Sequence, residues 1–215
     1  MRIYLVRHAQ AQTRANLNGI VVYDNQKNKG LTKKGEDQAK KLAEELNKVK
    51  IDKIFISEAK RAYKTILPLL KLKKGIPVKK DKRLDEFKYG IFSGLTLQEA
   101  GEKYPKVFKA RLKNKWDIPI PKGESFKGVA TRFNSFLNDL EKEGKKSQLE
   151  NVLIVTHATN LEAFLVKYLG LSIKKLDSVY FENASFSVFD FKNRKIKPVK
   201  INVKEILQRE KDKII

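Results

Sequence analysis

The sequence contains no cysteine and only two histidines among its 215 residues. The absence of cysteine excludes a disulfide framework and any metal site built on thiolates, and two histidines argue against a histidine-rich metal site. No apolar run approaches the roughly 18–20 residues that a membrane-spanning helix needs. Arg2, Arg7 and His8 interrupt the apolar N-terminus, so it lacks the hydrophobic region of a secretion signal. We therefore expect a soluble, cytoplasmic protein.

Basic residues outnumber acidic residues by 47 to 25, which gives a formal net charge of +22. Such an excess can indicate a polyanionic partner such as nucleic acid. However, only nine of the basic residues are arginine, and the lysines are spread along the whole chain. Paired hydrogen bonding to phosphate favours arginine, whereas scattered lysine with little methionine suits a solvated, heat-adapted surface. We expect neither nucleic acid nor a membrane as the main partner, and a positive field that attracts small phosphorylated substrates is compatible with either explanation of the charge.

Two apolar segments each lead into one of the two histidines. Residues 3–6 are followed by Arg7 and His8, and residues 152–156 are followed by His157. Such short, β-branched runs are typical of strands that are buried on both faces of a parallel sheet. Ligands gather at the carboxyl ends of strands in open α/β sheets, so we predict that both histidines lie in one site. The alternative, an ordinary polar residue at a strand end, explains one histidine better than it explains both.

Helical and strand-like segments alternate along most of the chain. Four segments have the apolar spacing of helices, and the first three begin at a serine or threonine that can act as N-cap: 32–46, 57–70, 125–140 and 161–169. Pro68 should kink or shorten the second of them. Short apolar or alternating runs predict strands at 53–56, near 78, and at 179–181, 186–191 and 196–203. The charged residues 204–215 are expected to form a terminal helix.

The segment 84–94 follows neither a helical nor a strand period. It carries two carboxylates, three aromatic residues and two glycines, and a loop of this kind in an α/β domain is usually functional. Thr96 can cap a short helix over 97–103, and a second helix is expected around 106–115. We interpret residues 83–123 as an insertion that caps one end of the sheet. The predicted fold is a three-layer α/β/α sandwich with a mostly parallel central sheet, in a single domain over residues 1–215.

The polar residues at these strand and helix ends suit the chemistry of phosphate. Arginines 7 and 61 and His157 can hold a dianion, and Arg61 should lie in the first turn of a helix, where backbone N–H groups also favour anions. A neutral His8 can attack phosphorus. Glu86 can protonate the departing alkoxide. This set of residues requires neither a metal nor a cofactor.

These segments resemble those of the histidine phosphatase superfamily, also called the phosphoglycerate mutase-like family. The segments that carry the resemblance occur in the family's order, from residue 3 to about 170: Leu5-Val6-Arg7-His8-Ala9-Gln10, Ser57 to Thr65, Leu84-Asp85-Glu86 with Tyr89, Gly90 and Gly94, Pro121 to Ser125 with Arg132, and Val155-Thr156-His157-Ala158. The resemblance implies that His8 is phosphorylated during turnover. It also implies that Arg7, Arg61 and His157 form the phosphate pocket and that Glu86 donates the proton.

The chain departs from the family pattern around the first histidine. Ala9 and Ala158 stand where the family usually has glycine, and Arg14 stands at the usual position of an asparagine that follows the first motif. Asn16 comes two residues later, and we expect it, with Ala158, to contribute to substrate binding. The absence of an aspartate at position 158 argues against the acid-phosphatase and phytase branch.

The resemblance leaves three kinds of function open. The short insertion favours a phosphomonoesterase that hydrolyses small phosphorylated metabolites over the alternative, a cofactor-dependent phosphoglycerate mutase. A non-catalytic protein that binds phosphate or RNA is disfavoured because all five catalytic positions are filled. The insertion should select the substrate, and Lys88, Tyr89, Arg111 and Lys115 are candidate contacts, although a solvated position is the more common role for such residues. The strands within 179–203 either close the sheet or pair between two chains in a homodimer.

Overall fold

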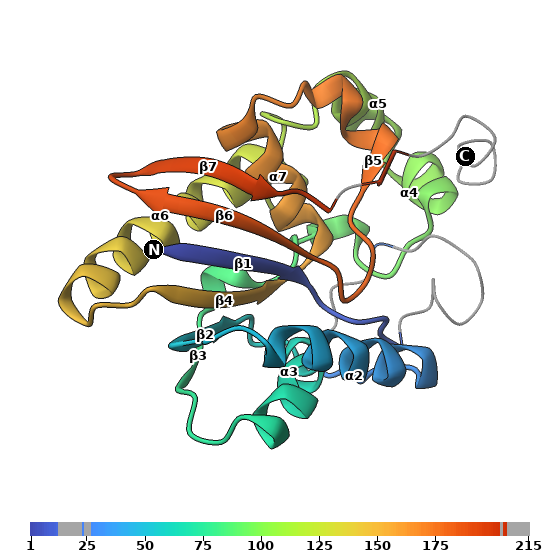
Figure 1. Ribbon diagram of the computed structural model, residues 1–215. Coiled ribbons are helices and arrows are strands. Elements are labelled where there is room, and N and C mark those ends of the chain that lie inside the picture. The colour runs from blue at the N-terminus through green and yellow to red at the C-terminus, as the bar shows by residue number, and fades with distance from the viewer. Residues whose placement is uncertain (13–22, 24–26, 203, 206–215) are drawn as a thin grey trace.

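The structure, a computed structural model, describes residues 1–12, 23, 27–202 and 204–205 (Figure 1). Its centre is a six-stranded sheet with the order β3-β2-β4-β1-β6-β7. Four strands run parallel to one another: β1 (Arg2–Arg7), β2 (Lys53–Ile56), β3 (Val78–Lys80) and β4 (Asn151–Thr156). Strand β6 (Phe186–Lys192) runs antiparallel to β1, and β7 (Lys195–Lys200) runs antiparallel to β6. The prediction of a mostly parallel sheet is confirmed.

Alternating side chains of β1 divide the core into two layers. Ile3 and Leu5 pack with phenylalanines of α6 (Phe126–Lys146) and α7 (Ala158–Leu169). Tyr4 and Val6 face the opposite side, where α2 (Lys33–Asn47) and α3 (Lys60–Leu72) cover the sheet (Figure 1). Because β1 is buried on both faces, its carboxyl end and the residues that follow it have little freedom to move. The three-layer sandwich that the sequence predicts is confirmed.

The insertion after β3 contains the short helices η1 (Lys82–Leu84), η2 (Gly90–Phe92), α4 (Leu97–Lys103) and α5 (Pro105–Lys113). In Figure 1, α4 and α5 lie beyond the end of the sheet toward which β1 and β4 point. Phe87, Phe92 and Ile120 form a third apolar cluster, which includes Val129 of α6 and Ala163 of α7. The insertion is therefore attached to the sandwich through α6 and through α7, the helix that starts directly after His157.

The two ends of this insertion lie against each other. The Ile91 N–H donates to the Pro121 carbonyl at 3.1 Å, and the Glu124 N–H donates to the Lys88 carbonyl at 3.0 Å. Glycine is required at this contact, because a Cβ on Gly90 would overlap the Pro121 carbonyl oxygen. We call this contact the neck of the insertion, and the part of the insertion between Gly90 and Gly123 begins and ends at it.

Several local predictions are confirmed, and three are wrong. Thr32, Thr96 and Ser125 cap α2, α4 and α6 through their side chains. Ser57 does not cap α3, because its hydroxyl contacts His157 and Ala59 occupies the N-cap position. Pro68 does not shorten α3, which continues to Leu72 with Leu69 buried against the sandwich, and a kink at Pro68 stays a prediction.

The third error concerns the start of the helix expected over residues 204–215, of which residues 206–215 lie outside the described part of the chain. Lys204–Glu205 form a short strand, β8, which pairs with β5 (Val179–Tyr180) and does not belong to a helix. Strands β5 to β8 thus pair within one chain. The division of the chain into a single domain stays a prediction.

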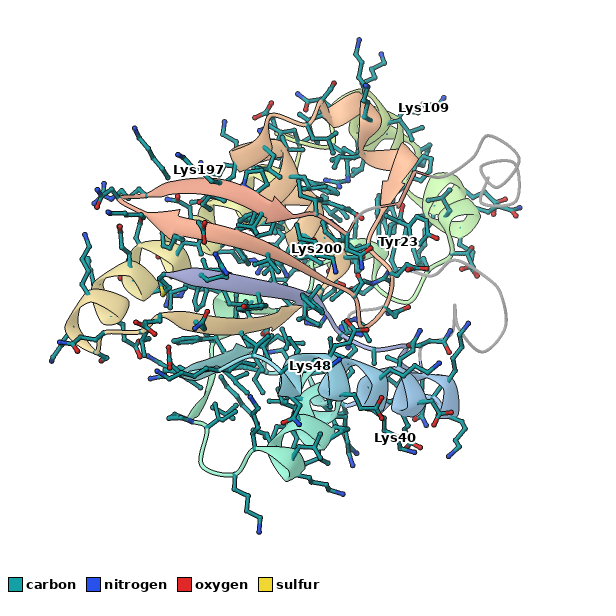
Figure 2. The ribbon with its side chains drawn as sticks, in the orientation of Figure 1. Tyr23, Lys40, Lys48, Lys109, Lys197 and Lys200 are labelled. Carbon is teal, nitrogen blue, oxygen red and sulfur yellow. The ribbon has the colours of Figure 1, made fainter. Side chains whose placement is uncertain are left out.

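Lysine dominates the edges of the sheet and much of the surface. The edge strand β3 presents Lys79 and Lys80, and the edge strand β7 combines lysines with Pro198. Charged residues and proline hinder the pairing of an exposed edge with another strand. The labelled Lys40, Lys109 and Lys197 in Figure 2 come from three separate elements on different sides of the view. Within the part of the chain that the structure describes, every helix is too short or too polar to cross a membrane.

We predict that Gly35→Ala destabilises the fold. Gly35 lies in the first turn of α2, where a Cβ would overlap the carbonyl oxygen of Gln10, two residues after His8. Overpacking of this kind costs about 1–3 kcal/mol in free energy of unfolding, which urea unfolding can measure. Gly101→Ala is the matched control, because its Cβ would lie 3.5 Å from the Phe108 ring in a helix that favours alanine. Equal stabilities of the two variants would contradict the prediction.

Candidate active site

His8 lies at the carboxyl end of β1, and its backbone is held on both sides. The His8 N–H donates to the Thr156 carbonyl of β4 at 3.0 Å. The His8 carbonyl accepts a hydrogen bond from Asn183 Nδ2 at 2.9 Å. The next N–H, that of Ala9, donates to Thr65 Oγ1 of α3 at 2.9 Å. Contacts from three separate parts of the chain thus fix the position of the His8 ring.

The partners of the His8 ring determine which nitrogen carries the proton. Nδ1 lies 2.7 Å from the Ala9 carbonyl, which can only accept, so Nδ1 is the protonated nitrogen. Nε2 accepts from Arg61 Nε at 3.2 Å and therefore presents its lone pair to the pocket. Burial, with the charges of Arg61 and Arg7, lowers the pKa of His8 well below its ordinary value of 6.5. A buried, neutral imidazole whose Nε2 carries no proton is a competent nucleophile once a bound anion takes over the Arg61 hydrogen bond.

Arg61 joins the two histidines. It lies in the first turn of α3 and is only 2% exposed. Besides the bond to His8, its NH2 group lies 3.1 Å from Nδ1 of His157. A cation at the N-terminus of a helix opposes the helix dipole, so this position disfavours the helix by itself and favours an anion beside it.

His157 follows β4 and is fully buried at the N-cap position of α7. Its Nε2 lies 2.8 Å from Ser57 Oγ, and because Arg61 must donate to Nδ1, Nε2 carries the proton and donates to Ser57. Burial, together with the charge of Arg61, lowers the pKa of His157 well below 6.5. The rings of His8 and His157 meet edge to face, with centroids 4.9 Å apart. Both imidazoles are therefore neutral and direct a lone pair toward the same guanidinium.

Arg7 contributes a second buried cation. Its NH1 group donates to the Phe181 carbonyl, and its Nε is a buried donor without a hydrogen-bond partner among the residues that the structure describes. Burial lowers the pKa of the Arg7 guanidinium, whereas the carboxylates of Glu162 and Glu86 raise it. An unsatisfied buried donor is costly unless a ligand accepts its hydrogen bond.

Glu86 stands at the edge of the pocket in the loop after η1. Its Oε2 lies 3.6 Å from Nδ1 of His157, and its Oε1 accepts from the Phe87 N–H at 2.8 Å. The carboxyl group is mostly shielded, with 13% of the side chain exposed. It is thus close enough to the two histidines to exchange a proton with a group bound between them.

The structure brings together His8, Arg61, Glu86 and His157, with Arg7 beside them, as the sequence predicts. Ala158 begins α7 directly after His157, so its backbone lies at the same helix N-terminus. Asn16 lies outside the described residues. The sequence predicts Ser57 as an N-cap and Thr65 as part of a motif, yet Ser57 orients His157 and Thr65 holds the backbone behind His8. Their partners are 100 and 56 residues away in sequence, so no local pattern could have identified these contacts.

His8, Glu86 and His157 are close enough together to hold a metal ion, but their surroundings suit an anion better. Nitrogen atoms of His8 and His157 and an oxygen of Glu86 lie within 4.8 Å of one another. However, the Arg61 guanidinium contacts both histidine lone pairs, and Arg7 adds a second positive charge. A divalent cation would have to displace or approach these charges, whereas a phosphate dianion would be stabilised by them.

Aromatic residues of the insertion border this pocket. The Tyr89 ring packs between those of Tyr23 and Phe87, with centroids 5.1 Å from each. Burial and the charges of Glu86 and Glu162 raise the pKa of the Tyr89 phenol, which places it near the pocket. Of the other candidate contacts, Lys88 is exposed, and Arg111 stacks over the Phe87 ring and donates to the Ile118 carbonyl. Lys115 lies over the Phe126 ring, farther into the insertion.

Comparisons with known proteins agree with this geometry. The sequence model of the histidine phosphatase superfamily (branch 1) matches residues 3–204 of this chain. The chain is 30% identical over 203 residues to phosphoserine phosphatase 1 of Hydrogenobacter thermophilus, covering 94% of this chain and 92% of that protein. The crystal structure of the α-ribazole phosphatase from Shigella flexneri has a TM-score of 0.79 and 25% identity, with 94% and 96% of the two chains covered. A mycobacterial glucosyl-3-phosphoglycerate phosphatase has a TM-score of 0.75 and 27% identity, with 94% and 98% covered.

We predict that stability falls as the pH falls from about 7 to about 5. Both histidine pKa values are lowered in the folded chain, so below 6.5 the unfolded chain binds more protons than the folded chain does. The free energy of unfolding should therefore decrease as the pH approaches the lowered pKa values. Urea unfolding across this range measures the effect, and His8→Asn should weaken the dependence. An identical slope in the variant would contradict the assignment of the effect to His8.

Proposed function

The chain belongs to branch 1 of the histidine phosphatase superfamily and is a phosphatase, and we propose that it hydrolyses small phosphomonoesters through a phosphohistidine at His8. The observation that carries this proposal is the state of His8: a neutral ring, protonated at Nδ1, whose Nε2 lone pair faces two buried arginines. A nucleophile and the charges that would hold its target thus meet at one point.

Arg7, Arg61 and His157 form the phosphate site in this proposal. A bound phosphate accepts hydrogen bonds from the Arg61 guanidinium, which then releases the His8 Nε2 lone pair for attack. Arg7 Nε, which lacks a partner among the described residues, supplies a further donor. The N-terminus of α7 after His157 adds backbone N–H groups that favour an anion. Together these groups stabilise the charge on the equatorial oxygens during transfer.

Glu86 acts as the acid and then as the base. In the first step His8 Nε2 forms a bond to phosphorus, the bond from phosphorus to the ester oxygen breaks, and protonated Glu86 gives its proton to that oxygen. In the second step a water molecule attacks the phosphohistidine, gives a proton to the Glu86 carboxylate, and releases phosphate from His8. The 3.6 Å separation of Glu86 and His157 supports this role, because it puts the carboxyl group beside the phosphate site.

The substrate is proposed at the level of a class. One relative is named a phosphoserine phosphatase, and structurally similar proteins include α-ribazole and glucosyl-3-phosphoglycerate phosphatases. Phosphoserine is thus the first compound to test within a screen of phosphorylated metabolites. The screen should include 2,3-bisphosphoglycerate, because transfer to a second substrate hydroxyl would support the alternative, a phosphoglycerate mutase. A cytoplasmic location and the absence of a required cofactor stay predictions.

We predict that His8→Ala abolishes turnover of an aryl phosphate, since no other residue that the structure describes presents an unprotonated imidazole nitrogen at the same position. Rapid quench in alkaline detergent with radiolabelled substrate should trap, in the natural protein only, a phosphoenzyme that is labile in acid and stable in base. The variant should keep its fold by circular dichroism. Turnover by the variant at the natural rate would overturn the assignment of His8.

We predict that Glu86→Gln loses about 10²–10⁴-fold in kcat/KM on an alkyl phosphate, the range that general acid catalysis contributes. The loss on p-nitrophenyl phosphate should be much smaller, because nitrophenolate departs without a proton. Steady-state kinetics on the two substrates give the comparison. Equal losses on both would remove Glu86 as the acid.

A further inference from the structure

The loop that carries Glu86 is gripped by hydrogen bonds before and after that residue. Before Glu86 in the chain, the carbonyls of Leu84 and Asp85 accept hydrogen bonds from Asn160 Nδ2 at 3.2 and 2.8 Å. The Leu84 carbonyl also accepts from Thr156 Oγ1 at 2.7 Å. These donors belong to α7 and the end of β4, so the approach to Glu86 is tied to the same elements that carry His157.

After Glu86 in the chain, Glu124 binds the backbone of Lys88. Glu124 Oε1 accepts from the Lys88 N–H at 2.9 Å, and the Glu124 N–H donates to the Lys88 carbonyl at 3.0 Å. The position of Glu86 therefore depends on attachments to both of its flanks.

Arg132 of α6 connects the two attachments. Its Nε and NH2 groups form a fork on the Glu124 carboxylate, both at 3.1 Å. Its NH1 group donates to Asn160 Oδ1 at 2.9 Å and to the Arg83 carbonyl at 2.5 Å. Asn160 is fully buried and uses both ends of its amide, so the Arg132 bond fixes the orientation in which the amide nitrogen faces the loop.

The Glu86 side chain has weaker restraints of its own. Among the described residues, its side chain accepts a hydrogen bond from the adjacent Phe87 N–H and lies 3.6 Å from His157. The backbone of the loop must then set where the carboxyl group stands. We propose that Glu124, Arg132 and Asn160 are positioning residues that hold Glu86 in place to protonate the leaving group. This inference rests on the proposed role of Glu86 as the acid.

The inference predicts a loss that depends on the leaving group. Displacement of a catalytic group by about 1 Å can cost about 10²-fold in rate. Asn160→Asp keeps the size of the side chain but sets a carboxylate oxygen against the two loop carbonyls. We expect kcat/KM on an alkyl phosphate to fall about tenfold to hundredfold, with a smaller loss on p-nitrophenyl phosphate.

A double-mutant cycle tests whether Asn160 acts through Glu86. If it does, adding Asn160→Asp to Glu86→Gln should cause little further loss on the alkyl phosphate, because the group that it positions is already gone. Fully additive losses, or an equal loss on both substrates in the single variant, would overturn the inference.

Arg132→Lys provides a second variant if Asn160→Asp fails to fold. It keeps the charge at a partly exposed position but loses the fork, and the same leaving-group dependence is expected. Arg83→Lys is the matched control. The Arg83 side chain bonds Asp81 and Asp139 and does not contact Asn160 or Glu124, so its kinetics on both substrates should remain those of the natural protein.

Hydrogen exchange separates failure of this inference from failure of the proposed function. In Arg132→Lys and Asn160→Asp, the N–H groups of Phe87 and Lys88 should exchange faster than in the natural protein, whatever the chemistry at His8. If Glu86→Gln itself shows no leaving-group dependence, the proposed function fails. If Glu86→Gln shows it and these two variants show neither that dependence nor faster exchange, the positioning role alone is overturned.

Discussion

The site depends on the contact of one buried guanidinium with two neutral imidazoles. Arg61 touches His8 and His157 at 3.2 and 3.1 Å in a pocket nearly closed to water. In that setting neither histidine can accept a proton without placing two positive charges side by side at low dielectric. The arrangement keeps both imidazole rings uncharged, so they do not neutralise the buried arginines, and a bound anion would stabilise these positive charges. The sandwich around it supplies the rigid strands and helix starts that keep these groups in contact.

Much of this arrangement could be predicted from local patterns. The runs that end in His8 and His157 identified two parallel strands whose carboxyl ends lie together, and β1 and β4 are direct neighbours. The helical spacing after Ser57 placed Arg61 in a first turn, as observed. These features depend on sequence periods and on the geometry of parallel sheets, both of which a single sequence reveals.

Contacts between distant residues could not be predicted in this way. Ser57 carries the signal of an N-cap, yet a histidine 100 residues later binds its hydroxyl and shifts the start of α3. Asn160 reads as a polar position on a helix, and only the packed structure brings its amide to two carbonyls of the Glu86 loop. The pairing of Lys204–Glu205 with β5 likewise rests on tertiary contact, since charged residues have little tendency to form strands on their own.

The neck of the insertion has a consequence for how such a site can change. Gly90 and Gly123 let the two ends of the segment touch, while Glu86 lies on the sandwich side of that contact. The length of the segment between the two glycines can then change without moving the backbone of the Glu86 loop, provided that Phe92, Ile120 and Arg111 keep their packing on Phe87. We expect this segment to select the substrate, so grafting it from a relative while keeping its contacts to Phe87 is a way to redirect selectivity and leave the acid in place.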